Sequence, residues 1–86
     1  MLPYKLVYTS AFIRDFDRLE DDIQDRIIVA LRRLQEHPFH GTKKLENVAY
    51  GKFRIRVGDY RIRYDLERKM IVLHSVKHRK DIYKDI

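Results

Sequence analysis

The stretch from Lys52 to Tyr64, KFRIRVGDYRIRY, decides the fold of this chain. Apolar and basic residues alternate through it, and the alternation is interrupted only at Gly58-Asp59. An alternation with a period of two predicts a strand with one buried face. A two-residue break that begins with glycine predicts a tight hairpin, most naturally a type II′ turn with Gly58 at a positive φ angle.

A two-residue loop also fixes which residues of the two strands lie opposite each other. The predicted pairs are Val57–Tyr60, Arg56–Arg61, Ile55–Ile62, Arg54–Arg63 and Phe53–Tyr64. One face of the predicted hairpin is therefore apolar. The other face is basic, with only Asp65 to balance the charge of Lys52, Arg54, Arg56, Arg61 and Arg63.

The basic face of this hairpin indicates an anionic ligand. Like charges directly opposite each other in an antiparallel pair are destabilising, by up to about 1 kcal/mol for each pair. Two facing pairs of arginines are explained if an anion lies over them, and the planar guanidinium group suits phosphate because it donates two parallel hydrogen bonds. The alternative interpretation is a solvated basic surface without a ligand.

The composition limits both the fold and the partners. A chain of 86 residues predicts a single domain, 1–86, with one small core. The formal net charge of +6 favours an acidic partner, either nucleic acid or an acidic protein. The absence of cysteine excludes disulfides, zinc thiolates and thiol catalysis. No long apolar run or signal-peptide pattern is present, so we expect a cytoplasmic protein that does not bind membranes.

The segments on either side of the hairpin predict the other elements. Tyr4 to Tyr8 alternates and predicts a first strand. Apolar residues at helical spacing predict a short helix after Thr9-Ser10 and a second helix from Asp21-Asp22 up to Pro38. Met70 to Val76 predicts the third strand of a meander, and its consecutive apolar residues indicate burial on both faces.

These elements together predict an α+β domain with a single sheet. The predicted order is an N-terminal strand, a two-helix antiparallel hairpin and a three-stranded antiparallel meander. We expect the helices to pack on the apolar face of the sheet and to leave the arginine-rich face open. The segment from Lys43 to Leu45 is compatible with either a paired strand or a loop.

No pattern in the sequence indicates a metal or cofactor site, because the four histidines have no partners at ligand spacing. Candidate proton carriers follow the third meander strand instead, where His78, Arg79 and Tyr83 lie beside the arginine-rich face if the tail folds back. The ordinary pKa of histidine, about 6.5, suits proton transfer, and a tyrosine can stack on a base. The alternatives are a surface histidine and a tyrosine that anchors the tail.

The succession of Lys44-Leu45, FRIRVGDYRIRY and VKHRKDIY resembles the RelE/ParE superfamily of toxins from type II toxin–antitoxin systems, over nearly the whole chain. For the RelE-like branch this implies a ribosome-dependent, metal-independent endoribonuclease that inhibits translation by cutting mRNA in the ribosomal A site. For the ParE-like branch it implies inhibition of DNA gyrase by binding, without nuclease activity. Both branches imply a cognate antitoxin. A stand-alone RNA-binding module is a third alternative.

The RelE-like resemblance also implies roles for individual residues. In the implied reaction the 2′-OH of the RNA attacks the adjacent phosphate and leaves a 2′,3′-cyclic phosphate, while cationic groups stabilise the charge that develops. The groups implied to hold the phosphate are Arg54, Arg56, Arg61 and Arg79. We expect Lys52 and Arg63 to steer the RNA.

The chain departs from the superfamily pattern at the residue that is implied to act as the general base. RelE-like enzymes often have lysines on the first strand of the hairpin, and one of them is implied to act as the base. This chain has arginines there, and their very high pKa makes them poor bases. The role then falls to His78 or Tyr83, unless the protein cuts slowly or does not cut.

Overall fold

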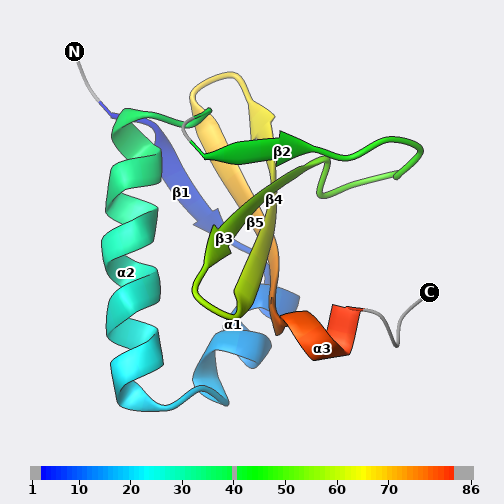
Figure 1. Cartoon of the computed structure of the whole chain (residues 1–86). Helices are drawn as coiled ribbons and strands as arrows, with labels where there is room; N and C mark the ends of the chain where they lie inside the picture. The colour runs from blue at the N-terminus through cyan, green and yellow to red at the C-terminus, as the bar shows by residue number, and fades with distance from the viewer. Residues whose placement is uncertain (1–2, 40, 83–86) are drawn as a thin grey trace.

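The computed structural model describes residues 3–39 and 41–82. It has one five-stranded sheet, in the order β1-β5-β4-β3-β2, and helices that pack against it. The elements are β1 (Lys5–Tyr8), α1 (Ser10–Asp17), α2 (Asp21–Glu36), β2 (Thr42–Lys44), β3 (Phe53–Val57), β4 (Tyr60–Glu67), β5 (Met70–His78) and α3 (Arg79–Ile82). Figure 1 shows α2 running along the sheet and α1 and α3 near one end of the strands. None of the helices in the described ranges is long and apolar enough to cross a membrane.

The central hairpin has the predicted register. Strands β3 and β4 are antiparallel, and all five predicted pairs are present, from Val57–Tyr60 beside the turn to Phe53–Tyr64 at the other end. Gly58 has a φ of 59°, and it is followed by a residue without a positive φ, which is the pattern of a type II′ turn. The structure therefore confirms the hairpin and its two faces.

The remaining strands extend this hairpin on both sides. Strand β5 pairs antiparallel with β4 and completes the predicted meander, and β1 pairs in parallel with β5. The segment that the sequence left open forms β2, an edge strand in which Thr42 lies opposite Ile55 and Lys44 opposite Phe53. The α+β architecture is confirmed, with β2 as one more strand than the predicted meander contains.

The helices cover the apolar face of the sheet, as predicted. Within the described ranges, the buried hydrophobic residues of the core are Phe12, Ile27, Leu31, Leu34, Ile55, Ile62, Tyr64, Ile71, Leu73 and Val76. Helix α2 contributes three of them and contacts β1 and β3, whereas the shorter α1 packs chiefly against β5. The hydroxyl of the fully buried Tyr64 donates a hydrogen bond of 2.6 Å to the carbonyl oxygen of Pro38, and so ties β4 to the end of the helical segment.

A β-bulge in β5 sets the direction of the side chains at the end of that strand. The pairing with β4 steps from Tyr64–Leu73 to Arg63–Ser75, which leaves His74 as an extra residue. An extra residue in one strand reverses its alternation of side chains relative to the sheet. The bulge therefore divides β5 into two parts with opposite alternation.

The buried residues of β5 follow this division. Ile71 and Leu73 are buried before the bulge and Val76 after it, so the inward positions change from odd to even numbers. Val72, on the other face, is half-buried, so the predicted burial on both faces holds only in part. Lys77 consequently joins the face that the helices leave open.

Replacing one valine on each side of the bulge by alanine tests the assigned side-chain directions. Val76→Ala removes two methyl groups from a side chain that is 2% exposed, and we expect it to lower the free energy of unfolding by about 2 kcal/mol. Val72→Ala is the matched control in the same strand, with an expected loss below about 1 kcal/mol. Urea unfolding measures both, and a larger loss for Val72→Ala would contradict the assigned alternation.

Candidate functional site

Basic side chains form two rows across the open face of the sheet. Strand pairing aligns Lys43 with Arg54 and Arg63 in one row, and Arg56 with Arg61 and Lys77 in the next. Neighbouring strands are only about 4.8 Å apart, so each row brings three like charges close together. We call these six residues the arginine face. The rows suit a chain of phosphates, since each phosphate can contact cations from more than one strand.

The turn of the hairpin gathers three of the predicted phosphate-binding residues. Nη1 of Arg61 donates a hydrogen bond of 3.1 Å to the carbonyl oxygen of Gly58, and Nε of Arg56 donates one of 3.3 Å to the same oxygen. Arg79, the first residue of α3, lies beside the turn, and its backbone N–H donates a hydrogen bond of 2.7 Å to the carbonyl oxygen of Asp59. Its Nε also lies 3.7 Å from Oδ1 of Asp59. We call Arg56, Arg61 and Arg79 the tip cluster.

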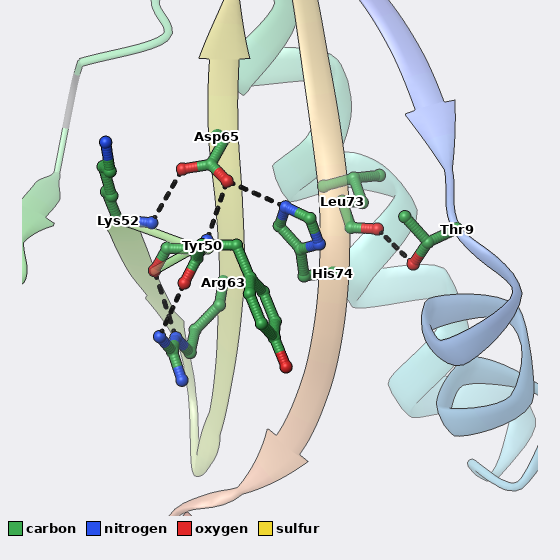
Figure 2. A network of polar contacts seen from close by, with 8 residues as sticks. Thr9, Tyr50, Lys52, Arg63, Asp65, Leu73 and His74 are labelled. Atoms are coloured by element: carbon green, nitrogen blue, oxygen red, sulfur yellow. Dashed lines mark hydrogen bonds and ion pairs between the residues drawn. The ribbon is translucent and has the colours of Figure 1, made fainter. Parts of the chain in front are cut away.

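The two predicted RNA-steering residues differ in their surroundings. The side chain of Lys52 is exposed, whereas Arg63 binds the loop between β2 and β3. Nε of Arg63 donates to the carbonyl oxygen of Gly51 at 3.1 Å, and Nη2 donates to that of Tyr50 at 3.0 Å (Figure 2). A Cβ atom on Gly51 would lie 3.2 Å from Nε of Arg63, so the glycine permits this close approach. Arg63 therefore positions the loop as well as adding charge to the arginine face.

Asp65 anchors the same loop from its other side (Figure 2). Its carboxylate accepts hydrogen bonds of 2.8 Å from the backbone N–H groups of Gly51 and Lys52, and Nε2 of His74 lies 2.9 Å from Oδ2. Burial raises the pKa of Asp65, but the two backbone N–H groups and His74 outweigh it, so the pKa lies below its ordinary value. The carboxylate is thus ionised at neutral pH, and the Nε2 atom of His74 is the donor.

A groove of about 640 Å³ separates this network from α1. Strand β1 ends opposite Leu73, and α1 covers the edge of β5 beyond that point. Asp15 of α1 accepts a hydrogen bond of 3.2 Å from the backbone N–H of Val76 and lies 3.4 Å from Nζ of Lys77. The residues that line the groove include Arg14, Arg18, Tyr50, Arg63, His74 and Lys77.

The placement of His78 corrects the prediction from sequence. His78 lies opposite Tyr60 on the face covered by the helices, and the two rings meet edge-on with centroids 5.3 Å apart. Its Nδ1 accepts a hydrogen bond of 3.2 Å from the backbone N–H of Lys80. The prediction ended the strand at Val76 and placed His78 in a tail that folds back, whereas β5 continues to His78, and the bulge at His74 turns its side chain to the helix-covered face. Tyr83 lies outside the described residues.

Several residues of the site were missed by the sequence reasoning. Neither His74 nor Lys77 was predicted as a site residue, although both line the groove. The signal for the bulge was present in the two adjacent polar residues His74 and Ser75 between the buried Leu73 and Val76. The two arginines of α1 carried no comparable signal, since only the fold places them beside β5.

The chemistry available on this face is that of fixed cations and one imidazole. Within residues 3–39 and 41–82, no three histidine, aspartate or glutamate side chains gather in a way that could hold a metal ion. The guanidinium groups of Arg56, Arg61 and Arg63 donate hydrogen bonds to backbone carbonyl oxygens, which orient these cations on the open face. The arrangement therefore suits the binding of a phosphodiester and the stabilisation of charge that develops on it.

Known proteins are similar to the chain over almost its whole length. The family described as "ParE toxin of type II toxin-antitoxin system, parDE" matches residues 6–83. Toxin RelG of Mycobacterium tuberculosis is 33% identical over 96% of this chain and 99% of its own length, and toxin RelE3 of Methanocaldococcus jannaschii is 29% identical over 92% and 94%. The toxin–antitoxin complex RelBE2 of M. tuberculosis contains a chain that is 28% identical, with a TM-score of 0.80 over 90% of this chain and 99% of that one.

Stability at different pH values tests the Asp65 network. Asp65→Asn removes the charge that accepts two backbone N–H groups and His74, so we expect it to lower the free energy of unfolding at pH 7 by about 1–3 kcal/mol. Because the pKa of Asp65 is lowered by folding, the carboxylate stabilises the protein above its ordinary pKa of about 3.9 and ceases to do so as the pH falls through its folded value.

The difference between wild type and Asp65→Asn should accordingly be constant near neutrality and shrink below about pH 4. Asp25→Asn, at an exposed position of α2, is the matched control, with an expected change within about 0.5 kcal/mol. Urea unfolding at several pH values measures both. A difference that grows as the pH falls would contradict the assigned direction of the pKa shift.

Proposed function

This chain belongs to the RelE/ParE superfamily of toxins from type II toxin–antitoxin systems, and from that premise we propose that it is a ribosome-dependent mRNA endoribonuclease. The similarity to toxins named RelE3 and RelG supports the RelE-like branch. The partners under this proposal are mRNA in the ribosomal A site and a cognate antitoxin. Solved neighbours that are themselves RelB–RelE complexes support the antitoxin.

The tip cluster is the observation that carries this proposal. The reaction is the attack of a ribose 2′-OH on the adjacent phosphorus, which forms the 2′-O–P bond, breaks the P–O5′ bond and leaves a 2′,3′-cyclic phosphate. Negative charge develops on the phosphate oxygens as the phosphorane forms. Arg56 and Arg61, fixed by the carbonyl oxygen of Gly58, and the neighbouring Arg79 are positioned to stabilise that charge, with Arg54 in the adjacent row.

Two protons must also move in this reaction, one from the 2′-OH and one to the departing 5′-oxygen. Arginine is too weak a base to accept the first. His78 faces Tyr60 on the helix-covered side of the sheet, which leaves Tyr83 as the proton carrier among the residues expected from the sequence. We propose that the arginines supply charge stabilisation and that Tyr83 takes part in proton transfer.

Inhibition of DNA gyrase by binding is the second candidate function. It is favoured by the match to a family described as ParE toxin. The arginine face would then contact a protein, and no side chain of the face would need to take part in chemistry. Substitutions that remove single charges would weaken binding gradually rather than abolish a reaction.

Primer extension on a defined mRNA in a cell-free translation reaction tests the nuclease proposal. We expect discrete in-frame cuts that appear only with ribosomes. Arg61→Ala should lower the rate of cutting by about a hundredfold or more, the usual effect of removing one group that stabilises transition-state charge. Arg32→Ala, which removes a cation from an exposed position of α2, is the control and should cut like wild type. Circular dichroism should show both variants folded.

The His78→Ala variant separates the proposed proton carriers in the same assay. We expect it to retain cutting, because the His78 ring lies against Tyr60 on the opposite face of the sheet. Loss of cutting in a folded His78→Ala protein would contradict that assignment. If a folded, toxic wild-type protein makes no cuts at all, the nuclease proposal fails, and a DNA supercoiling assay then tests gyrase.

A further inference from the structure

We propose that the groove between α1 and β5 is a second RNA subsite, which holds a nucleotide of the single-stranded mRNA next to the cleaved one. This inference rests on the proposed function. In this subsite Arg14 and Arg18 bind phosphate, and the ring of Tyr50 stacks on a base. The groove is separate from the tip cluster, and it is lined by residues of α1, of the β2–β3 loop and of the open face of the sheet.

The two arginines of α1 supply the first argument. Arg14 and Arg18 are one helical turn apart, both are exposed, and both line the groove. Neither side chain has a hydrogen bond or ion pair with any residue in the described ranges. Like charges four residues apart destabilise a helical turn. Two such cations beside a groove suit an anion that enters it.

Asp15, the acidic residue among the described residues that line the groove, is already engaged. Asp15 accepts the backbone N–H of Val76 and lies 3.4 Å from Nζ of Lys77, so it closes the edge of β5. The charge that remains at this side of the groove is therefore positive. The volume of the groove, about 640 Å³, falls within the usual range for small-molecule sites and is sufficient for one nucleotide.

The position of Tyr50 supplies the second argument. Its side chain is 64% exposed, yet the loop that carries it is fixed at three consecutive residues. Arg63 binds the carbonyl oxygens of Tyr50 and Gly51, and Asp65 binds the N–H groups of Gly51 and Lys52. The ring of Tyr50 meets the ring of His74 at a tilt of 52°, with centroids 5.1 Å apart. Figure 2 shows the two side chains next to each other. An aromatic ring held rigidly at the rim of a cationic groove is the usual platform for an unpaired base.

The groove is also continuous with the arginine face. Arg63 and Lys77 belong to both, one in each of the two cationic rows. An RNA strand with its reactive phosphate at the tip cluster can therefore extend into the groove without leaving the cationic surface. A double strand does not fit this description, since its bases are stacked on each other and unavailable to Tyr50.

Binding of an uncleavable RNA to the protein alone tests this subsite. The probe is a 2′-O-methyl trinucleotide of adenosine, in which the attacking hydroxyl is blocked, and backbone amide signals in NMR report its position. We expect shifts for groove residues such as Ala11, Tyr50 and Lys77. Tyr50→Leu should weaken binding about tenfold, whereas Tyr50→Phe, which keeps the ring, should stay within about twofold of wild type.

The salt dependence of binding tests the phosphate contact. Arg14→Gln should weaken binding and lower the slope of log K against log salt concentration by about 0.7, the value for one phosphate of a single strand. Arg32→Gln removes an equal charge from an exposed position of α2 outside the groove and should leave the slope unchanged. An equal decrease in both variants would mean a general charge effect and would overturn the subsite.

Inorganic phosphate and an acidic peptide, used as alternative ligands in the same NMR experiment, test the other possible occupants of the groove. If inorganic phosphate moves the groove signals as strongly as the trinucleotide does, the groove is an anion site without base stacking, and the proposal is wrong. If an acidic peptide moves them and the trinucleotide does not, the groove binds protein, and the proposal is also wrong. Failure here is distinguishable from failure of the proposed function, because this assay contains no ribosomes and requires no cleavage.

Discussion

The two-residue turn at Gly58-Asp59 is the constraint on which the rest of the structure depends. It fixes the register of β3 and β4, and the register decides which side chains enter the core. With the observed register Ile55 and Ile62 are buried together, and the arginines between them lie on the open face. A shift of one residue in either strand would exchange the two sets and bring guanidinium groups into the core, at a desolvation cost that a domain of this size cannot absorb.

The bulge at His74 is a second constraint, and it acts on β5 as the turn acts on the hairpin. One extra residue allows Leu73 and Val76 to enter the core although they are three positions apart. The same residue places Lys77 in the arginine face and turns His78 towards Tyr60. The composition of the open face therefore follows from how β5 completes the core.

The features that the sequence predicted depend on residues close together in the chain. The features that it did not predict depend on contacts between residues far apart in the chain. The hairpin, its register and both helices depend on local periodicity and turn chemistry, which are visible in a single sequence. The groove instead depends on contacts between distant segments, such as Asp15 with Val76 and Asp65 with Gly51. His78 was misplaced because the strand was predicted to end at Val76, whereas β5 continues to His78 and contains a bulge. The pair of polar residues at His74 and Ser75 was the available sign of it.

The way in which the arginines are held explains how a stable fold keeps so much positive charge on one surface. Arg56, Arg61 and Arg63 donate hydrogen bonds to backbone carbonyl oxygens, which are neutral groups that help to fix the guanidinium positions. Asp65, an acidic residue of β4 on the open face, is directed to backbone N–H groups and to His74. If carboxylates stood in place of those carbonyl oxygens, each would form an ion pair with a guanidinium group. Phosphate would have to break these ion pairs before it could bind, so the anion site would be weaker. Backbone carbonyl oxygens therefore help to set the geometry of this face, and the carboxylates of Asp15 and Asp59 lie only at its margins, beside Lys77 and Arg79.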